Sequence, residues 1–136
     1  MGTLPTIRIN LDSSEPAYRQ IAGALRTLLV DGTFAVGYQL PPVRQLATDL
    51  GVHHNTVAQA YHILADEGWL TLRRRHGAVV IERCSPKPTP EVRSAFLRRL
   101  RELGAEAKAA GLAPDVVADT MRAVARHFVE RRLARG

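Results

Sequence analysis

Two short runs of apolar residues, separated by the single glycine Gly51, constrain the fold of this chain more than any other feature. Within each run the apolar positions repeat at intervals of three and four, which is the spacing of one face of an α-helix. The first run contains Val43, Leu46, Ala47 and Leu50, and the second contains Val57, Ala60, Tyr61 and Leu64. Gly51 suits the left-handed backbone conformation that ends many helices. Two helices joined by so tight a turn match the helix-turn-helix, whose second helix enters the major groove of DNA.

The outward face of the second helix carries side chains suited to reading bases. When the apolar stripe points inward, the outer positions are Asn55, Gln59, His62 and Asp66, flanked by Thr56, Ala58 and Ile63. Asparagine and glutamine can pair bidentately with adenine, and a threonine methyl can contact the methyl group of thymine. The alternative is an ordinary amphipathic helix pair, and these two helices alone do not separate the two interpretations.

The distribution of charge is more informative than its total. The net charge is +6 over 136 residues, but residues 1–82 carry 7 Arg against 7 Asp and Glu, whereas residues 83–136 carry 12 Lys and Arg against 6 Asp and Glu. The overall basicity is therefore weak support for nucleic-acid binding. Cys84 is the only cysteine, which excludes a disulfide framework and a cysteine-based zinc site. Because neither a signal peptide nor an apolar run of membrane length is present, we expect a soluble, cytoplasmic protein without membrane contact.

The segment before the motif predicts a strand, a helix and a linker. Residues 6–11 alternate between apolar and polar and predict a short strand. Pro16 after serine and glutamate is typical of a helix start, and Asp31 with Gly32 is typical of its end. This helix has one apolar stripe, formed by Tyr18, Ile21, Ala22, Leu25, Leu28 and Leu29. We interpret residues 34–39 as a linker, after which Pro41 and Pro42 open the first helix of the motif.

The segment after the motif predicts a β-hairpin. Residues 69–73 and 78–82 alternate as strands do, and the four residues 74–77 between them include a glycine. A helix-turn-helix followed by a two-stranded hairpin is a winged helix. The tip of the hairpin carries Arg73, Arg74, Arg75 and His76. Three guanidinium groups and an imidazole on a protruding loop can clamp phosphates or a minor groove, although a solvated charged turn is the alternative.

A change of composition predicts two domains. Residues 83–89 contain two prolines, a serine and Cys84, so we predict a winged-helix domain over 1–82, a linker over 83–89 and a two-helix segment over 90–136. Two helices in so short a segment cannot bury their apolar faces against each other alone. A second copy of the chain is the expected cover. The candidate dimerisation residues are Val92, Phe96, Leu100, Leu103, Val117, Met121, Val124 and Phe128.

Four segments resemble the GntR family of bacterial transcription regulators. They are Pro16–Ala22, Leu40–Val52, Asn55–Leu70 and His76–Val80, which together span most of residues 7–82. The short two-helix tail resembles the YtrA-type subfamily, which lacks a large effector domain and is associated with repression of its own operon. The resemblance implies a homodimeric winged-helix repressor on a palindromic operator.

The resemblance also assigns roles to individual residues. Arg44 matches an arginine that reaches phosphate or base, and Thr56 matches a threonine that contacts the DNA backbone. Gly77, preceded by His76, matches the wing glycine that lets the loop enter the minor groove. His54 stands where the family places an arginine. The complete set of candidate DNA-binding residues is Arg44, His53, His54, Asn55, Thr56, Gln59, His62, Arg73, Arg74, Arg75, His76 and Gly77.

Other functions are less consistent with the sequence. The histidines, Asp66 and Glu67 fit no HExxH spacing, and we find neither a nucleophile elbow nor a phosphate loop, so we expect no enzyme and no cofactor. Two alternatives stay open, which are a metal-responsive repressor that uses the histidines and a winged-helix module for protein interaction. The sequence does not identify the operator, the regulated genes or any small-molecule effector.

Overall fold

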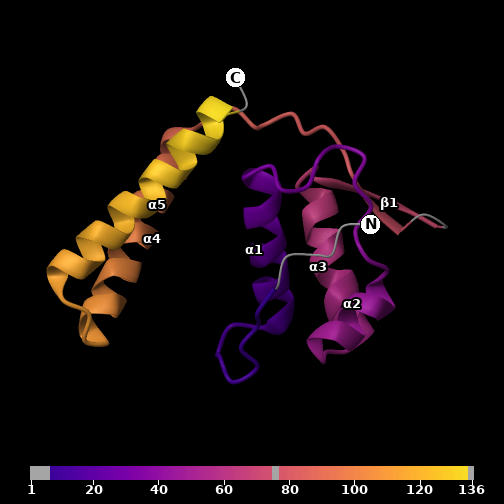
Figure 1. Cartoon of the computed structure of the whole chain (residues 1–136), viewed down its shortest axis with the longest axis horizontal. Helices are drawn as coiled ribbons and strands as arrows, with labels where there is room; N and C mark the ends of the chain where they lie inside the picture. The colour runs from indigo at the N-terminus through magenta and orange to yellow at the C-terminus, as the bar shows by residue number, and fades with distance from the viewer. Residues whose placement is uncertain (1–6, 75–76, 135–136) are drawn as a thin grey trace. The chain divides into compact units, whose positions relative to one another are not determined.

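A computed structural model describes residues 7–74 and 77–134 of the chain. The elements are α1 (Ala17–Val30), α2 (Val43–Leu50), α3 (His54–Asp66), β1 (Leu70–Arg73), β2 (Gly77–Val80), α4 (Pro90–Ala109) and α5 (Pro114–Ala134) (Figure 1). The predicted fold class, mostly α-helical with a small β-wing, is confirmed. The chain forms two compact units, Met1–Cys84 and Ser85–Gly136, which divide within the segment expected to be a linker. In the described part of the chain, no helix is long and apolar enough to cross a membrane.

The core of the first unit forms around α3, which packs against α1, α2 and β1. Its largest fully buried side chains are Ile21, Leu25, Leu40, Val57 and Leu64. Burying a side chain of this size contributes about 1.5–3 kcal/mol. Because one stripe of α3 is buried by its neighbours, the opposite stripe is held in a fixed orientation toward solvent.

The tight turn between α2 and α3 has the predicted geometry. Gly51 caps α2 with φ +71°, which is the left-handed conformation that glycine adopts without steric cost. The amide of Val52 then donates to the carbonyl oxygen of Ala47 at 3.0 Å. The turn therefore provides a hydrogen-bond donor for the last turn of α2 and directs the chain into α3 within three residues.

The predicted strand over residues 6–11 is wrong for its described part, because residues 7–10 have no regular secondary structure. Ile7 and Ile9 are partly buried and pack against the core, which accounts for their alternation. The side chain of Gln20 makes hydrogen bonds with both backbone groups of Asn10. It accepts from the amide at 2.7 Å and donates to the carbonyl oxygen at 2.9 Å. The alternation thus arises because one face of this segment packs against the core, and not because the segment pairs as a strand.

The interpretation of residues 34–39 as a plain linker is also wrong. The amides of Gly37 and Leu40 donate to the carbonyl oxygens of Val80 and Ala78, both at 2.8 Å. Val80 returns a bond from its amide to the carbonyl oxygen of Tyr38 at 2.9 Å, and Gln39 forms a β-bridge with Val79. The segment therefore runs antiparallel to β2 and covers its outer edge. Only a few residues of this segment are paired, and so short a run does not produce a recognisable strand pattern in the sequence.

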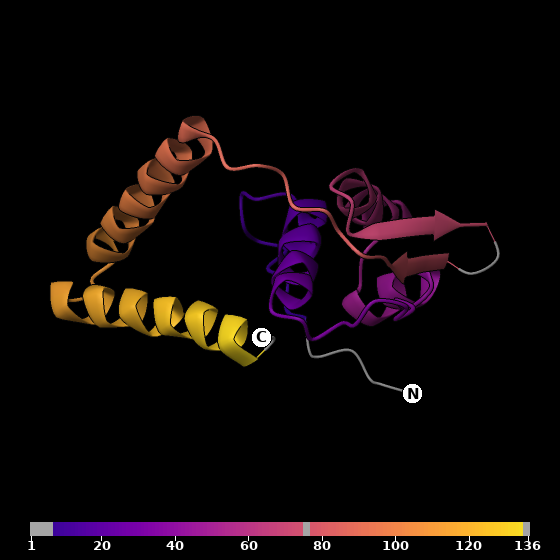
Figure 2. The same ribbon diagram turned by 90° about the horizontal axis from the view of Figure 1, so that it is seen from above.

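The wing is the antiparallel pair of β1 and β2, which projects beyond the helices of its unit (Figure 2). Leu70 pairs with Val80 at the base, and Arg73 pairs with Gly77 at the outer end. Gly77, which the sequence placed in the loop, is therefore the first residue of β2. Gly77 has φ +64°, so it supplies the left-handed conformation at the point where the chain turns into β2.

The second unit is a helical hairpin with little interior. Its start is as predicted, because the Thr89 side chain accepts from the amide of Val92 at 3.3 Å and Pro90 occupies the first turn of α4. The helices approach closely at Gly104, where an added Cβ would lie 2.9 Å from the terminal carbon of Met121. From the loop that joins them, α4 and α5 diverge (Figure 2). This geometry leaves many of their apolar side chains uncovered.

Candidate nucleic-acid interface

The outer face of α3 is arranged as the helical periodicity predicts. Val57, Ala60, Tyr61 and Leu64 are buried, whereas Asn55, Gln59, His62 and Asp66 are exposed. Thr56 is half-buried beside them. Two side-chain amides one turn apart, with free donors and acceptors in solvent, can form the paired hydrogen bonds that distinguish base edges.

His53 precedes α3 as its N-cap and is not part of the helix. Its Nδ1 atom accepts a hydrogen bond from the amide of Asn55 at 3.1 Å. In this contact Nδ1 is the acceptor, which fixes the orientation of the ring. The His54 ring stacks on the His53 ring, with centroids 4.2 Å apart. The two imidazoles are therefore held together at the N-terminal end of α3.

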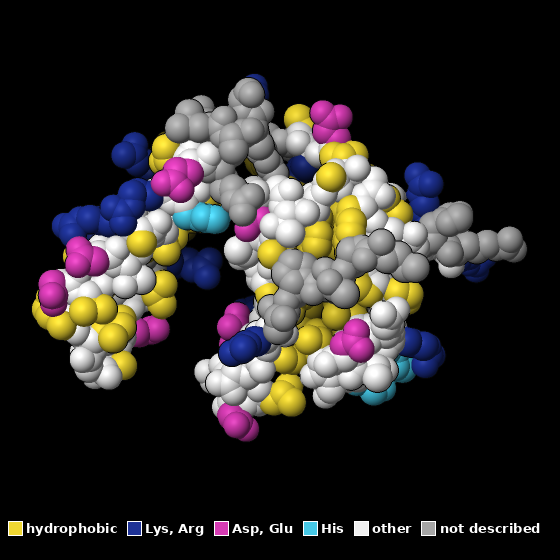
Figure 3. All heavy atoms as spheres, viewed as in Figure 1, with side chains coloured by type: hydrophobic (Ala, Val, Ile, Leu, Met, Phe, Trp, Pro, Cys, Tyr) yellow, Lys and Arg dark blue, Asp and Glu magenta, His cyan; other side chains and the backbone are white. Residues whose placement is uncertain are grey.

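Arg44 of α2 lies near this pair of rings. The pKa of His54 is lowered from its usual value, first because burial disfavours the charged ring and then because His53 and Arg44 repel a further positive charge. Arginine and histidine side chains are grouped on the surface near α2 and the start of α3 (Figure 3). A cluster of cationic and cation-forming groups at a helix N-terminus favours an anionic ligand.

The wing carries the second group of basic residues. Arg73 and Arg74 are exposed. Arg75 and His76, which the sequence also places in this group, lie outside the described residues. Gly77 presents backbone without a side chain, and a Cβ there would meet only the distant end of Gln39, at 4.0 Å. The described part of the wing is thus basic and narrow at its outer end.

A groove between α3 and the wing brings the two groups of predicted residues together. His62 lines it from α3, and Arg73 and Gly77 line it from the wing. Sequence reasoning missed Pro42 and Leu72, which line the same groove. Leu72 shares a strand face with buried Leu70, but it lies farther toward the tip and is 38% exposed. Two leucines on one face of so short a strand were the sequence signal that could have pointed to Leu72 as a groove residue.

A partly buried hydrogen bond fixes α3 relative to the start of α2. The Tyr61 hydroxyl donates to the carbonyl oxygen of Pro41 at 2.7 Å, and burial raises the pKa of Tyr61. Pro42 caps α2 without any side-chain hydrogen bond to the helix. Tyr61 therefore holds the start of α2, and with it Arg44, at a set distance from the exposed face of α3. Among the described residues, no group of three or more His, Cys, Asp and Glu could hold a metal ion.

Comparison with known proteins identifies the same region. The family of bacterial regulatory proteins named gntR matches residues 17–80. The transcriptional repressor YtrA of Bacillus subtilis is 32% identical over 106 residues, which cover 78% of this chain and 82% of that protein. The solved structure of YtrA from Sulfolobus acidocaldarius, described as a GntR-family transcription factor, superposes with a TM-score of 0.57. It is 36% identical and covers 70% of this chain and 97% of that one.

A third similarity extends over the second unit. The solved structure of a transcriptional antiterminator from Listeria monocytogenes covers 93% of this chain and 95% of its own, with a TM-score of 0.69. At 20% identity it shows the fold alone. The helix-turn-helix, the wing and the relatives agree, so the chain belongs to the GntR family of bacterial transcriptional regulators and carries that family's DNA-binding domain.

Proposed function

We propose that this protein is a transcriptional repressor that binds a palindromic DNA operator as a homodimer. The observation that carries the proposal is the exposed face of α3, whose amides lie between two groups of basic side chains. Arg44 and His54 form one group, and Arg73 and Arg74 belong to the other. Phosphates of one duplex then bind on both sides of the helix that reads the bases.

Each side chain has a distinct part in this arrangement. Arg44, His54 and Thr56 contact phosphates and set the depth of α3 in the major groove. Asn55 and Gln59 face the base edges and carry sequence preference. The wing places its arginines along the adjacent minor groove, where the negative potential is strongest when the groove is narrow.

Uncovered apolar side chains support the homodimer. Val92, Phe96 and Leu103 of α4 are 63%, 66% and 62% exposed, and Val124 and Phe128 of α5 are 51% and 55% exposed. So large an uncovered surface costs free energy in water and marks an interaction site. Val117 and Met121 differ from the other candidates, because they face Gly104 inside the hairpin. We therefore assign them to the packing of α4 on α5.

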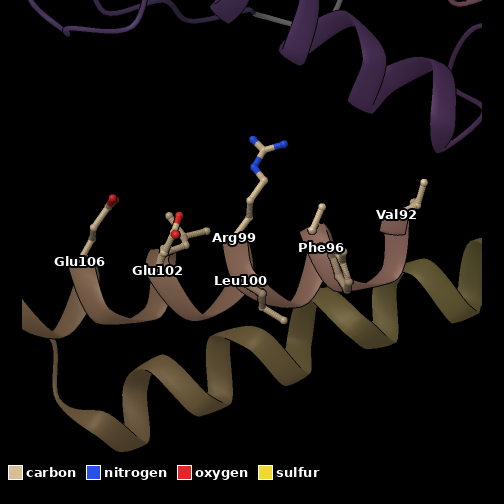
Figure 4. Close-up of a pocket in the computed structure, with 8 residues that line it drawn as sticks. Val92, Phe96, Arg99, Leu100, Glu102 and Glu106 are labelled. Carbon is tan, nitrogen blue, oxygen red and sulfur yellow. The ribbon is translucent and has the colours of Figure 1, made fainter. Parts of the chain in front are cut away.

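Charge on α4 favours a second copy of the chain as the partner. Arg99, Glu102 and Glu106 project from the side of α4 that faces away from α5, whereas Leu100 points toward α5 (Figure 4). These three charges line the same groove as Val92, Phe96 and Leu103. A face that carries both signs of charge around an apolar centre is self-complementary under a two-fold axis. Two-fold symmetry in the protein then matches a palindromic operator.

The assignment as a repressor rests on the similarity to YtrA of Bacillus subtilis, which is named as a transcriptional repressor. Binding an operator that overlaps a promoter is sufficient for repression. The test is selection of binding sites from a random double-stranded DNA library, followed by mobility-shift titration. We expect enrichment of an inverted repeat with half-sites about one helical turn apart, roughly 34–36 Å. Recovery of no enriched sequence would contradict the proposal.

A further inference from the structure

Four side chains meet at the C-terminal end of α3, away from the residues assigned to DNA. Glu67, which caps α3, accepts a hydrogen bond from Nε of Arg26 at 2.8 Å and a second one from the same guanidinium group. The indole nitrogen of Trp69 donates to the Glu67 carboxylate at 3.3 Å. These bonds, with that to Arg26 foremost, lower the pKa of Glu67. The carboxylate thus links α1, the end of α3 and the residue before β1.

The fourth side chain belongs to Arg83, the next-to-last residue of the first unit. Its Nε donates to the backbone carbonyl oxygen of Glu67 at 2.8 Å, and its guanidinium carbon lies 4.4 Å from the centroid of the Trp69 ring. The guanidinium group therefore makes both a hydrogen bond and a cation–π contact. The unit ends at Cys84, so Arg83 holds the chain where it leaves the unit.

Backbone pairing of the wing ends before this point. The last bond is from the amide of Ile81 to the carbonyl oxygen of Trp69 at 3.1 Å. Without the Arg83 contacts, residues 82 and 83 would join the segment that connects the units. Each freed residue extends the reach of a chain by up to about 3.5 Å, so two residues add up to about 7 Å. That length is comparable with two base-pair steps of about 3.4 Å each.

We propose that Arg83 is a positioning residue that fixes the exit of the chain against the end of α3. Through this exit it limits the distances that the two copies of α3 can adopt in the dimer. The inference rests on the homodimer proposed above. With the exit fixed, residues 84–89 alone connect it to α4, so the range of half-site spacings is narrower than when residues 82 and 83 are also freed.

The neighbouring residue provides a probe. Cys84 is exposed and is the only cysteine of the chain, so a nitroxide spin label can be attached there in the full-length protein. Continuous-wave spectra report the mobility of the label, and pulsed dipolar spectra report the distance between the two labels of a dimer. The variants are Arg83→Met and, as a milder removal of the charge, Arg83→Gln. Arg83→Lys restores a cation, and Arg8→Met makes the same change at an exposed site in the same unit.

We expect a more restricted label and a narrower distance distribution in the unchanged protein and in Arg8→Met than in the two neutral variants at position 83. Arg83→Met and Arg83→Gln should lose the restricted spectral component and broaden the distribution, and Arg83→Lys should recover part of both. A cooperative urea transition followed by the emission of Trp69, the only tryptophan, shows that each variant is folded. If Arg83→Met does not fold, the comparison of Gln with Lys at this position decides.

The outcomes separate this inference from the proposed function. Dipolar coupling with a distribution that is equally narrow in all variants would overturn the role of Arg83 and leave the homodimer intact. Absence of coupling between labels in the unchanged protein would overturn the homodimer, and the inference with it.

Discussion

The hydroxyl group of Tyr61 on α3 donates a 2.7 Å hydrogen bond to the carbonyl oxygen of Pro41, the residue before the cap of α2. This bond connects the helix proposed to read bases with the start of the helix that carries Arg44. Because Tyr61 is buried and Pro41 is half-buried, water replaces the lost bond less well than at an exposed site. It therefore sets the spacing between a base-reading and a phosphate-binding element.

Tyr61→Phe should destabilise the first unit by about 1–3 kcal/mol, because it leaves the Pro41 carbonyl group without its partner. Urea denaturation measures the free energy of unfolding. Tyr38→Phe is the matched control, since the Tyr38 ring stacks on Phe34 at 4.8 Å and this contact does not need the hydroxyl group. Equal unfolding free energies for the two variants would argue against a role for the Tyr61 bond.

Arg44→Ala and a combined change of Arg73, Arg74 and Arg75 to alanine should weaken DNA binding without unfolding the chain, because Arg44, Arg73 and Arg74 lie outside the buried core. Each lost phosphate contact should reduce the slope of log affinity against log salt by about 1. Titrations at several salt concentrations give this slope. If the slope of the triple variant equals that of the unchanged protein, the wing does not bind phosphates.

Gln59→Ala should mainly relax sequence preference. Gln59 is exposed at the centre of the outer face of α3, and a bidentate contact to a base discriminates by about 1–3 kcal/mol. Affinities for the selected operator and for single-base variants of it should converge at one position of each half-site. A uniform loss of affinity over all variants would instead indicate a backbone contact.

DNA binding should be tighter at pH 6 than at pH 8 because of His54. Its pKa in the free protein is lowered by burial, His53 and Arg44, whereas a nearby phosphate favours the charged ring and raises the pKa in the complex. The linked binding energy is fully present below the free pKa and is lost as pH rises through the bound pKa. His54→Arg, which stays charged, should flatten the dependence of the dissociation constant on pH. If the unchanged protein and the His54→Arg variant had identical pH profiles, His54 would not be the source of the pH dependence.

A charge in the proposed dimer interface should dissociate the dimer. Phe96→Asp and Leu103→Asp each place a carboxylate in the apolar centre of the α4 face, at a desolvation cost of several kcal/mol if that face is buried. Ser94→Asp, also exposed on α4 but outside that groove, is the control. Sedimentation equilibrium should show monomers for the first two variants and dimers for the control. Dimers in all three would place the interface elsewhere.

The sequence was sufficient for the parts of the fold that depend on local pattern. The apolar spacing predicted the helix-turn-helix. Gly51 marked a helix end because glycine readily adopts the left-handed conformation, and Thr89 marked a helix start because its hydroxyl group accepts from a backbone amide. Exposure of Asn55, Gln59 and His62 followed from the same spacing. These predictions succeed since a helix determines which side chains share a face.

Contacts between residues far apart in the sequence could not be predicted. The pairing of residues 37–40 with β2 depends on backbone hydrogen bonds, which leave little trace in side-chain pattern. The contacts of Arg83 with Glu67 and Trp69 join positions up to 16 residues apart, and the effect of Arg44 on His54 joins two helices. Each of these features requires the tertiary fold before the partners can be identified.

The stoichiometry of DNA binding tests the central claim most directly. Sedimentation velocity of the full chain, and of a chain that ends at Cys84, should be measured with a selected palindromic duplex and with a single half-site. The full chain should bind the palindrome as two copies per duplex, and the shortened chain, which keeps Arg83 but lacks α4 and α5, should be a monomer that binds much more weakly. One full-length copy per palindrome, or equal affinity of the shortened chain, would contradict a homodimeric operator-binding regulator.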